Sequence, residues 1–387
     1  MSDTLCETRH PDGRFRVVVT KPLPGTRWLD LLTGADCRVE VCGGQRPLTA
    51  DEIAATIGET CDAAIVQLTE RWDAGLLERL AGAGGRVLGN YAVGYDNVDV
   101  SRATALGIAV GNTPGILTET TAELAVALTF AAARRVVEGQ RYLAEGLFSG
   151  WLPSLLLGKR LWRKTLGVVG AGRIGATYAR MLVEGHKMDL VYVDPRRSDE
   201  LEAFVAAYGA FLEARGEQRV SCRRVATLDE LLESADVVSL HLALDDTTRH
   251  VIDAGRLARM KDDAILVNTA RGALVDERAL VDHCRSHPHF SAALDVFEHE
   301  PRLAPGLLEL PNVVAVPHLG SATGWTRRGM ATLAAANVVG VLSGWPVWDG
   351  DVAPFLGPDA PRAAPSIVNA AALQLPILRA TARVTRR

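Results

Sequence analysis

Residues 165–175 read Thr165-Leu166-Gly167-Val168-Val169-Gly170-Ala171-Gly172-Arg173-Ile174-Gly175. An apolar run breaks here into the pattern G-x-G-x-x-G and continues into a segment of helical composition, which predicts a strand, a tight turn and a helix. In such a turn the first glycine permits the bend, the second lets the backbone approach a pyrophosphate, and the third lets the helix pack on the strand. The run therefore predicts a dinucleotide site that includes Gly170, Gly172, Arg173, Ile174 and Gly175.

The next apolar run, residues 190–193, ends at Asp194, which lies 19 residues beyond Gly175. An acid at this place accepts hydrogen bonds from the adenosine ribose and repels a 2′-phosphate, which favours NAD(H). Arg196 and Arg197 follow at once, and either could pair with a phosphate. The sequence thus favours NAD(H) and leaves NADP(H) open. The plain alternative is a glycine-rich turn that binds nothing, and the spacing to Asp194 argues against it.

The composition indicates a globular protein of two domains. The chain has 387 residues, 48% of them hydrophobic, and a formal net charge of −4. We expect no nucleic-acid partner because there is no basic excess, and no membrane span because the longest apolar runs are short. The N-terminus lacks the apolar segment of a secretory signal, and the chain ends in Val384-Thr385-Arg386-Arg387 rather than the peroxisomal S-K-L. We therefore expect an intracellular, soluble protein, in the cytosol or in an organelle such as the mitochondrion or peroxisome.

The six cysteines show no spacing typical of a metal site. We expect reduced thiols, as is usual inside cells, and no bound metal.

Strand and helix patterns alternate along the chain, which predicts an α/β protein with parallel sheets. They fall into two series, and the second starts at the glycine run, so we expect two doubly wound, Rossmann-like domains. Two long helical patterns, residues 120–135 and 326–342, are natural crossings between them. We expect the C-terminal part to return to the first domain, residues 195–228 to contain an amphipathic helix, and residues 350–365 to be irregular. The expected strands cover residues 15–20, 37–42, 63–67, 87–89, 109–111, 165–169, 190–193, 237–241, 264–268, 292–295 and 313–316.

Polar residues follow three strands of the second series, where α/β sheets bind their ligands. They occupy residues 268–272, 294–301 and 316–321. A reductase of keto acids needs a cation for the carboxylate and a proton donor for the developing alkoxide. A carboxylate beside a histidine fixes its tautomer and favours its protonated form. Arg271, His318 and Glu300 could supply these functions, although nine histidines and 46 acids offer other trios.

These stretches, together with the glycine run, resemble the D-isomer-specific 2-hydroxyacid dehydrogenases. The resemblance implies a central NAD-binding domain at residues 126–319. It also implies a split, flavodoxin-like substrate domain, formed by residues 1–125 and 320–387.

The resemblance also implies roles for individual residues. Arg271, Glu300 and His318 match the catalytic group, and the E-P pair selects Glu300 over Glu298. Asp295 matches the acid that receives the nicotinamide carboxamide, and Thr121 matches a threonine near the cofactor phosphates. The cofactor set as a whole comprises Thr121, Gly170, Gly172, Arg173, Ile174, Gly175, Asp194, Thr269, Ala270, Arg271, Asp295, His318 and Gly320.

Within the family the likeness is nearest to the plant-type hydroxypyruvate reductases. It rests on residues 90–99, 111–123, 181–185 and 365–369 and on the long link after Asp194. It implies NADH-dependent reduction of hydroxypyruvate to D-glycerate, with glyoxylate reduced to glycolate as a secondary activity. It also implies that the N–H groups around Val93 and Gly94 bind the substrate carboxylate together with Arg271 and His318.

Trp151 matches a tryptophan that enters the partner subunit's active site in related reductases, so we expect a homodimer. The plain alternative is that Trp151 only packs at a dimer interface.

Two other functions remain open. One is another D-2-hydroxyacid dehydrogenase, for instance of the phosphoglycerate type, although no basic cluster near Val93 suggests a phosphate site. The other is an NADH-sensing, corepressor-like protein on the same fold, because a fold alone does not fix a function.

Overall fold

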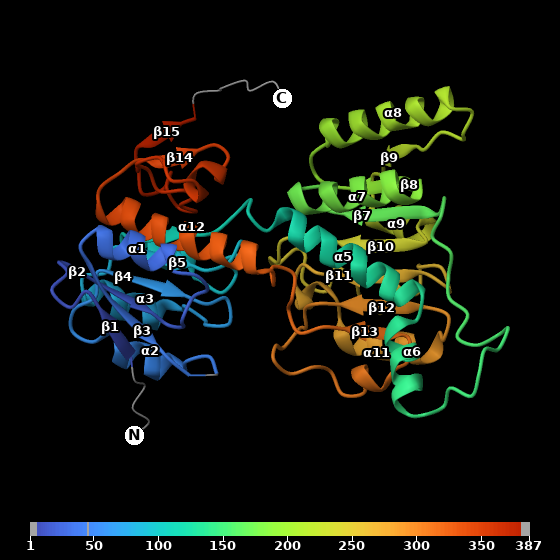
Figure 1. Cartoon of the computed structure of the whole chain (residues 1–387), viewed down its shortest axis with the longest axis horizontal. Helices are drawn as coiled ribbons and strands as arrows, with labels where there is room; N and C mark the ends of the chain where they lie inside the picture. Colours follow the sequence, from blue (N-terminus) through green and yellow to red (C-terminus); the bar gives the residue numbers. More distant parts are fainter. Residues whose placement is uncertain (1–5, 45, 381–387) are drawn as a thin grey trace. The chain divides into compact units, whose positions relative to one another are not determined.

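The computed structural model describes residues 6–44 and 46–380 (Figure 1). The chain folds into two compact units. Unit 1 comprises Met1–Leu117 and Thr323–Arg387, and unit 2 comprises Thr118–Ala322. Thr323–Arg387 thus clusters with Met1–Leu117, and the domain boundaries expected at 125/126 and 319/320 stay a prediction. Helix α5 (Thr118–Ala133) is continuous and packs on the strands of unit 2.

Unit 1 is built on a sheet with the strand order β1-β3-β2-β4-β5-β6. All neighbours are parallel except β1, which runs antiparallel to β3. Without β1 the order is 2-1-3-4-5 along the chain, which is the flavodoxin-like order. The strands are β1 (Cys6–Arg9), β2 (Phe15–Val19), β3 (Cys37–Cys42), β4 (Ala63–Val66), β5 (Val87–Asn90) and β6 (Ala109–Gly111).

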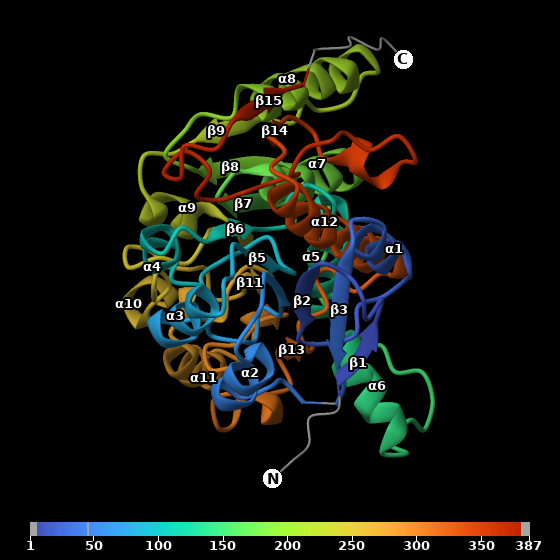
Figure 2. The ribbon, with the colours of Figure 1, turned by 90° about the vertical axis from the view of Figure 1, so that its left-hand side faces the viewer.

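Helices cover both faces of this sheet, with α1 and α12 on one side and α2 and α3 on the other (Figures 1 and 2). Helix α12 begins after Thr323, whose side chain accepts a hydrogen bond from the Thr326 N–H, and most of its residues are buried. The helices are α1 (Arg27–Gly34), α2 (Ala50–Ile57), α3 (Ala74–Gly82), α4 (Val100–Ala105), α12 (Gly324–Leu342) and the 3₁₀ turn η3 (Ala353–Leu356). A two-stranded parallel sheet, β14 (Val347–Asp349) and β15 (Ile377–Arg379), completes the unit.

Unit 2 contains a fully parallel sheet with the order β13-β12-β11-β10-β7-β8-β9, stacked from bottom to top in Figure 1. Numbered along the chain this is 3-2-1-4-5-6 with a seventh strand added, the dinucleotide-binding order. From β7 the strands are added toward one edge of the sheet, and from β10 they are added toward the other edge. Ligands are therefore expected at the carboxyl ends of β7 and β10, where the order changes direction. The strands are β7 (Thr165–Val169), β8 (Asp189–Val193), β9 (Cys222–Arg224), β10 (Val237–Leu240), β11 (Ile265–Asn268), β12 (Ser291–Leu294) and β13 (Val313–Ala315).

Two apolar layers enclose the sheet of unit 2. Side chains of α5, α7 and α8 pack on one face, and side chains of α9, α10 and α11 pack on the other. The expected α/β class with two doubly wound domains is therefore confirmed. The helices are α6 (Val136–Ala144), α7 (Arg173–His186), α8 (Asp199–Ala214), α9 (Leu228–Ser234), α10 (Ala254–Leu257), α11 (Glu277–Ser286) and the 3₁₀ turns η1 (Gly272–Leu274) and η2 (Leu307–Glu309).

One expectation about the cysteines is wrong. Cys6 and Cys42 form a disulfide, because the antiparallel register of β1 on β3 places them directly opposite each other. Cys37, Cys61, Cys222 and Cys284 are free thiols. No pattern in the sequence indicates this pairing, since nothing in residues 6–9 predicts the strand β1.

The long link after β8 contains a helix. The amphipathic helix between 195 and 228 is α8, which buries Leu201, Val205 and Leu212. Among residues 6–44 and 46–380, no helix is long and apolar enough to cross a membrane, and no group of three His, Cys, Asp or Glu side chains could hold a metal. The terminal residues 384–387 lie outside the described part of the chain.

Candidate functional site

The turn after β7 has the shape that a pyrophosphate needs. Gly170 has φ +91°, and a Cβ there would lie 2.8 Å from the carbonyl oxygen of His241. A Cβ on Gly175 would lie 2.0 Å from the Gly170 oxygen, so only glycine permits this packing. A Cβ on Gly172 would meet nothing within 4 Å, which leaves open space at the first turn of α7. Arg173 and Ile174 begin that helix.

Asp194 follows the carboxyl end of β8 beside this turn. Its carboxylate accepts hydrogen bonds from the N–H of Ala171 at 2.9 Å and of Arg196 at 2.8 Å. The guanidinium of Arg197 is paired with Glu202, its Nε donating to Oε2 at 2.9 Å. The acid expected to hold the ribose is therefore fixed against the glycine turn by the backbone.

The loop after β11 carries Thr269, Ala270 and Arg271. The Asn268 side chain fixes this loop with two hydrogen bonds: it accepts from the Ala270 N–H at 3.0 Å and donates to the Arg271 carbonyl at 2.8 Å. Arg271 donates from Nη1 to the Ala270 carbonyl at 2.7 Å. The hydroxyl of Thr269 is buried and has no partner in the described chain. An orphaned hydroxyl here and the open space at Gly172 both fit a nicotinamide dinucleotide.

His318 and Glu300 form a hydrogen-bonded pair. Nδ1 of His318 lies 3.0 Å from Oε2 of Glu300, and the other carboxylate oxygen accepts from the Phe297 N–H at 3.0 Å. Burial favours the neutral form of Glu300, but the hydrogen bond and charge of His318 outweigh it, so the net effect lowers the pKa of Glu300. The carboxylate of Glu300 is therefore held in its ionised form beside the ring of His318.

The neighbouring Glu298 is engaged elsewhere. Its carboxylate lies 2.6 Å from Nε2 of His250, whose backbone N–H donates to the Ala273 carbonyl at 2.8 Å. His250 thus connects the loop of Glu298 to the loop of Arg271. The geometry agrees with the choice of Glu300 as the partner of His318.

Asp295, Thr121 and Gly320 meet behind His318. Asp295 is 1% exposed, and its carboxylate accepts from the N–H groups of Leu319 and Gly320. Burial raises the pKa of Asp295, and these two hydrogen bonds oppose that rise. The Thr121 hydroxyl donates to the Gly320 carbonyl at 3.1 Å. The loop of His318, itself at φ +54°, is therefore fixed from two sides.

Comparisons with known proteins agree with this geometry. Residues 126–320 match the family model described as D-isomer specific 2-hydroxyacid dehydrogenase, NAD binding domain. The chain belongs to this family. A glycerate dehydrogenase of Cucumis sativus is 54% identical, and the match covers 95% of this chain and 97% of the relative. The peroxisomal glycerate dehydrogenase HPR of Arabidopsis thaliana is 53% identical, and the match covers 96% of this chain and 97% of the relative. The structure of the TT0316 protein from Thermus thermophilus has 38% identity and a TM-score of 0.76, covering 92% of this chain and 100% of that one.

In unit 1 of this dehydrogenase, the loop after β5 carries Val93 and Gly94. The Val93 carbonyl accepts from Asn112 Nδ2, and the Gly94 carbonyl accepts from Asn90 Nδ2, both at 2.8 Å. Val93 and Gly94 belong to unit 1, and Arg271 and His318 belong to unit 2.

Trp151 lies in the segment between α6 and β7 and is 82% exposed. Leu147, Phe148, Leu152 and Leu157 of the same segment are exposed apolar side chains too, as is Leu143 near the end of α6. Monomeric proteins rarely expose so many neighbouring large apolar residues.

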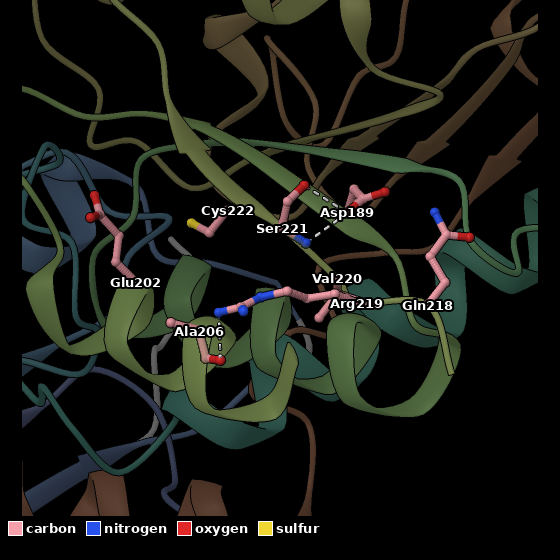
Figure 3. A pocket seen from close by; sticks show the side chains of 8 residues that line it. All are labelled: Asp189, Glu202, Ala206, Gln218, Arg219, Val220, Ser221 and Cys222. Atoms are coloured by element: carbon pink, nitrogen blue, oxygen red, sulfur yellow. Dashed lines mark hydrogen bonds between the residues drawn. The ribbon is translucent and has the colours of Figure 1, made fainter. Parts of the chain in front are cut away.

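A cavity of about 560 Å³ lies between α8 and the strands β8 and β9 (Figure 3). Ser221 donates twice to Asp189 there, each time at 2.7 Å. Burial raises the pKa of the Cys222 thiol to about 12, which keeps it protonated and unreactive. Asp189 and Cys222 begin their strands, so the cavity lies at the amino edge of the sheet, opposite the loops that follow β11, β12 and β13.

Sequence reasoning missed several residues of the site. His250 lies in no local motif. Asn90 and Asn112 lie within residues 90–99 and 111–123, which carry the family likeness, but no role was predicted for either of them. A further signal was that both stand at the ends of strands, where polar residues gather in α/β sheets.

Proposed function

We propose that this protein reduces hydroxypyruvate to D-glycerate with NADH, and glyoxylate to glycolate as a secondary activity. The observation that carries the proposal is the pair of Glu300 and His318, placed after the ends of β12 and β13 beside the loop of Arg271. The near full-length likeness to a protein named glycerate dehydrogenase supports the choice of substrate.

The residues of unit 2 account for the proton transfer. When bound, reduced nicotinamide supplies the hydride that enters the carbonyl carbon. His318 donates the proton to the carbonyl oxygen from Nε2, because Nδ1 is held by Glu300 at 3.0 Å. The negative charge of Glu300 stabilises the imidazolium before the transfer. One hydride and one proton convert the keto acid to the 2-hydroxy acid.

Two groups bind the substrate carboxylate in this proposal. Arg271 provides a permanent positive charge, and the N–H groups of Val93 and Gly94 provide neutral donors. Unit 1 is then the substrate domain and unit 2 the cofactor domain. A keto acid with a further phosphate would need additional cations near Val93.

NADH is the proposed cofactor in preference to NADPH. Asp194 follows β8 and is bonded to the glycine turn, where the family pattern leads us to expect the acid that accepts from the ribose, and Arg197 is paired with Glu202. A 2′-phosphate would therefore meet a negative charge with one nearby arginine already paired.

The proposed assembly is a homodimer formed through the exposed apolar segment that contains Trp151. Burial of that segment would remove its side chains from water, at about 25 cal/mol for each Å² of apolar surface. The proposal includes contact between Trp151 and the substrate of the partner subunit.

The test is oxidation of NADH with four substrates in parallel: hydroxypyruvate, glyoxylate, pyruvate and 3-phosphohydroxypyruvate. Fastest turnover of hydroxypyruvate supports the proposal. Preference for the phosphorylated acid would replace it by the phosphoglycerate type. Tight NADH binding without turnover of any of the four would favour an NADH-sensing protein.

A further inference from the structure

Two consecutive carbonyl groups in the loop after β5 point into unit 1, toward buried carboxamides. Val93 is bonded to Asn112, and Gly94 is bonded to Asn90. Asn90 is fully buried and Asn112 nearly so. Buried amides are costly unless they are hydrogen-bonded, so these contacts fix the loop in one conformation.

The direction of the carbonyls determines the direction of the N–H groups. The peptide bonds of this loop are trans, so the C=O of one residue and the N–H of the next point in opposite directions. The inward carbonyl of Val93 therefore turns the Gly94 N–H outward. The Ala92 carbonyl accepts from the Thr113 N–H at 2.8 Å, which turns the Val93 N–H outward in the same way. Within the described chain neither N–H has an acceptor, and two adjacent donors of this kind suit an anion.

The orientation of Asn112 is itself fixed by the C-terminal part of the chain. Ser366 donates from Oγ to Asn112 Oδ1 at 2.6 Å, so the amide nitrogen of Asn112 must face Val93. Asn337 on α12 donates to the Asn112 carbonyl at 2.9 Å and accepts from the Ser366 N–H at 2.8 Å. The Ser366 hydroxyl therefore determines which end of the Asn112 carboxamide contacts the loop. Asn337 in turn fixes the backbone of Ser366.

We infer that Asn112 is a positioning residue for the substrate carboxylate, and that Asn337 and Ser366 hold it in place. This inference rests on the proposed role of Val93 and Gly94. Asn112 does not touch the substrate; it keeps two backbone donors aimed at the carboxylate before the substrate arrives. Because the carboxylate is bound alike in the ground state and the transition state, loss of this positioning raises KM more than it lowers kcat.

The experiment compares Asn112→Ala with Asn369→Ala. Asn369 is a matched control, because it is likewise a buried carboxamide and lies in the C-terminal part of the chain near Ser366. It donates to the Thr104 hydroxyl and the Ile108 carbonyl, both at 2.9 Å, and has no contact with the loop of Val93. For Asn112→Ala we expect KM for hydroxypyruvate to rise about 10- to 100-fold, the effect of a lost hydrogen bond to a charged group. We expect kcat to fall less than about threefold and the Kd for NADH to stay unchanged.

An unchanged KM in folded Asn112→Ala, or an equal rise in Asn369→Ala, would overturn the inference. If Asn112→Ala does not fold, Ser366→Ala is the second variant. It leaves Asn112 in place but removes the hydroxyl that orients it, and we expect KM to rise about 3- to 10-fold. An unchanged KM in Ser366→Ala would then overturn the inference.

Binding of oxalate to the NADH complex, measured by calorimetry, separates this inference from the proposed function. Oxalate needs no turnover, so weaker binding to Asn112→Ala than to Asn369→Ala supports the positioning role whatever the natural substrate is. Equal binding to the two variants rejects the positioning role. Failure of the wild type to reduce any keto acid rejects only the proposed function.

Discussion

Replacing Glu300 by glutamine tests how the protein keeps its proton donor charged. The change removes a negative charge 3.0 Å from Nδ1 of His318 while preserving the shape of the side chain. At an effective dielectric constant of about 20, two unit charges at this distance attract by about 5 kcal/mol. The two side chains are 27% and 25% exposed, so solvent weakens the attraction, and about 1.5–3 kcal/mol is the expected difference. That corresponds to a fall in kcat of at most about 10- to 150-fold.

The direction follows from the charge that forms on His318 during the reaction. Reduction consumes a protonated ring that the Glu300 charge stabilises, so kcat for reduction at neutral pH should fall in Glu300→Gln. Oxidation of D-glycerate produces that protonated ring, so its kcat should fall as well.

The assay is kcat at neutral pH in both directions, with NADH affinity measured as a check on folding. Glu298→Gln is the matched control, because Glu298 contacts His250 and not His318. An unchanged kcat in Glu300→Gln, or an equal fall in Glu298→Gln, would refute the reasoning.

Four further expectations can be checked with simpler measurements. Asp194→Ala should narrow the ratio of Kd values for NADPH and NADH, and an unchanged ratio would contradict the ribose role. Gly170→Ala should lower Tm and weaken NADH binding, because a Cβ would lie 2.8 Å from the His241 oxygen at φ +91°; a strain of about 1–3 kcal/mol is expected. Cys42→Ser should lower the free energy of unfolding by about 3–4 kcal/mol, since the disulfide closes a loop across a sequence separation of 36; the wild type should lose the same amount in reductant, and no loss would contradict the link. Trp151→Ala should raise KM for hydroxypyruvate and shift the mass measured by light scattering toward the monomer; a wild-type monomer would remove the dimer proposal.

Central strands are predictable because each carries a continuous apolar run. Parallel strands that are covered on both faces read this way, and β7, with its burial on both sides, is an example. The edge strands β6 and β13 are largely buried and carry apolar runs as well. The edge strands β1 and β9 do not. Strand β1 reads Cys-Glu-Thr-Arg and β9 reads Cys-Arg-Arg, because most of their side chains are exposed. Neither is predicted from its residues, and the disulfide of Cys6 depends on β1.

The same distinction applies to the site. Groups that belong to a local motif, such as the glycine turn or the P-H pair of His318, could be located from the sequence. Groups that act through distant partners could not. Ser366 and Asn112 are 254 residues apart, and His250 and Glu298 are 48 apart. A hydrogen bond between such residues depends on the packing of whole elements, which no short pattern encodes.

The split of unit 1 has a physical consequence for both candidate binding loops. The chain leaves unit 1 after Leu117 and returns at Thr323, and residues near the two crossings are bonded to each other within each unit. In unit 1 the Asn112 carbonyl accepts from Asn337, and in unit 2 the Thr121 hydroxyl donates to Gly320. The first contact lies beneath the loop of Val93, and the second lies behind the loop of His318. Because each contact is internal to its unit, a change in the angle between the units would leave the local geometry of both loops intact.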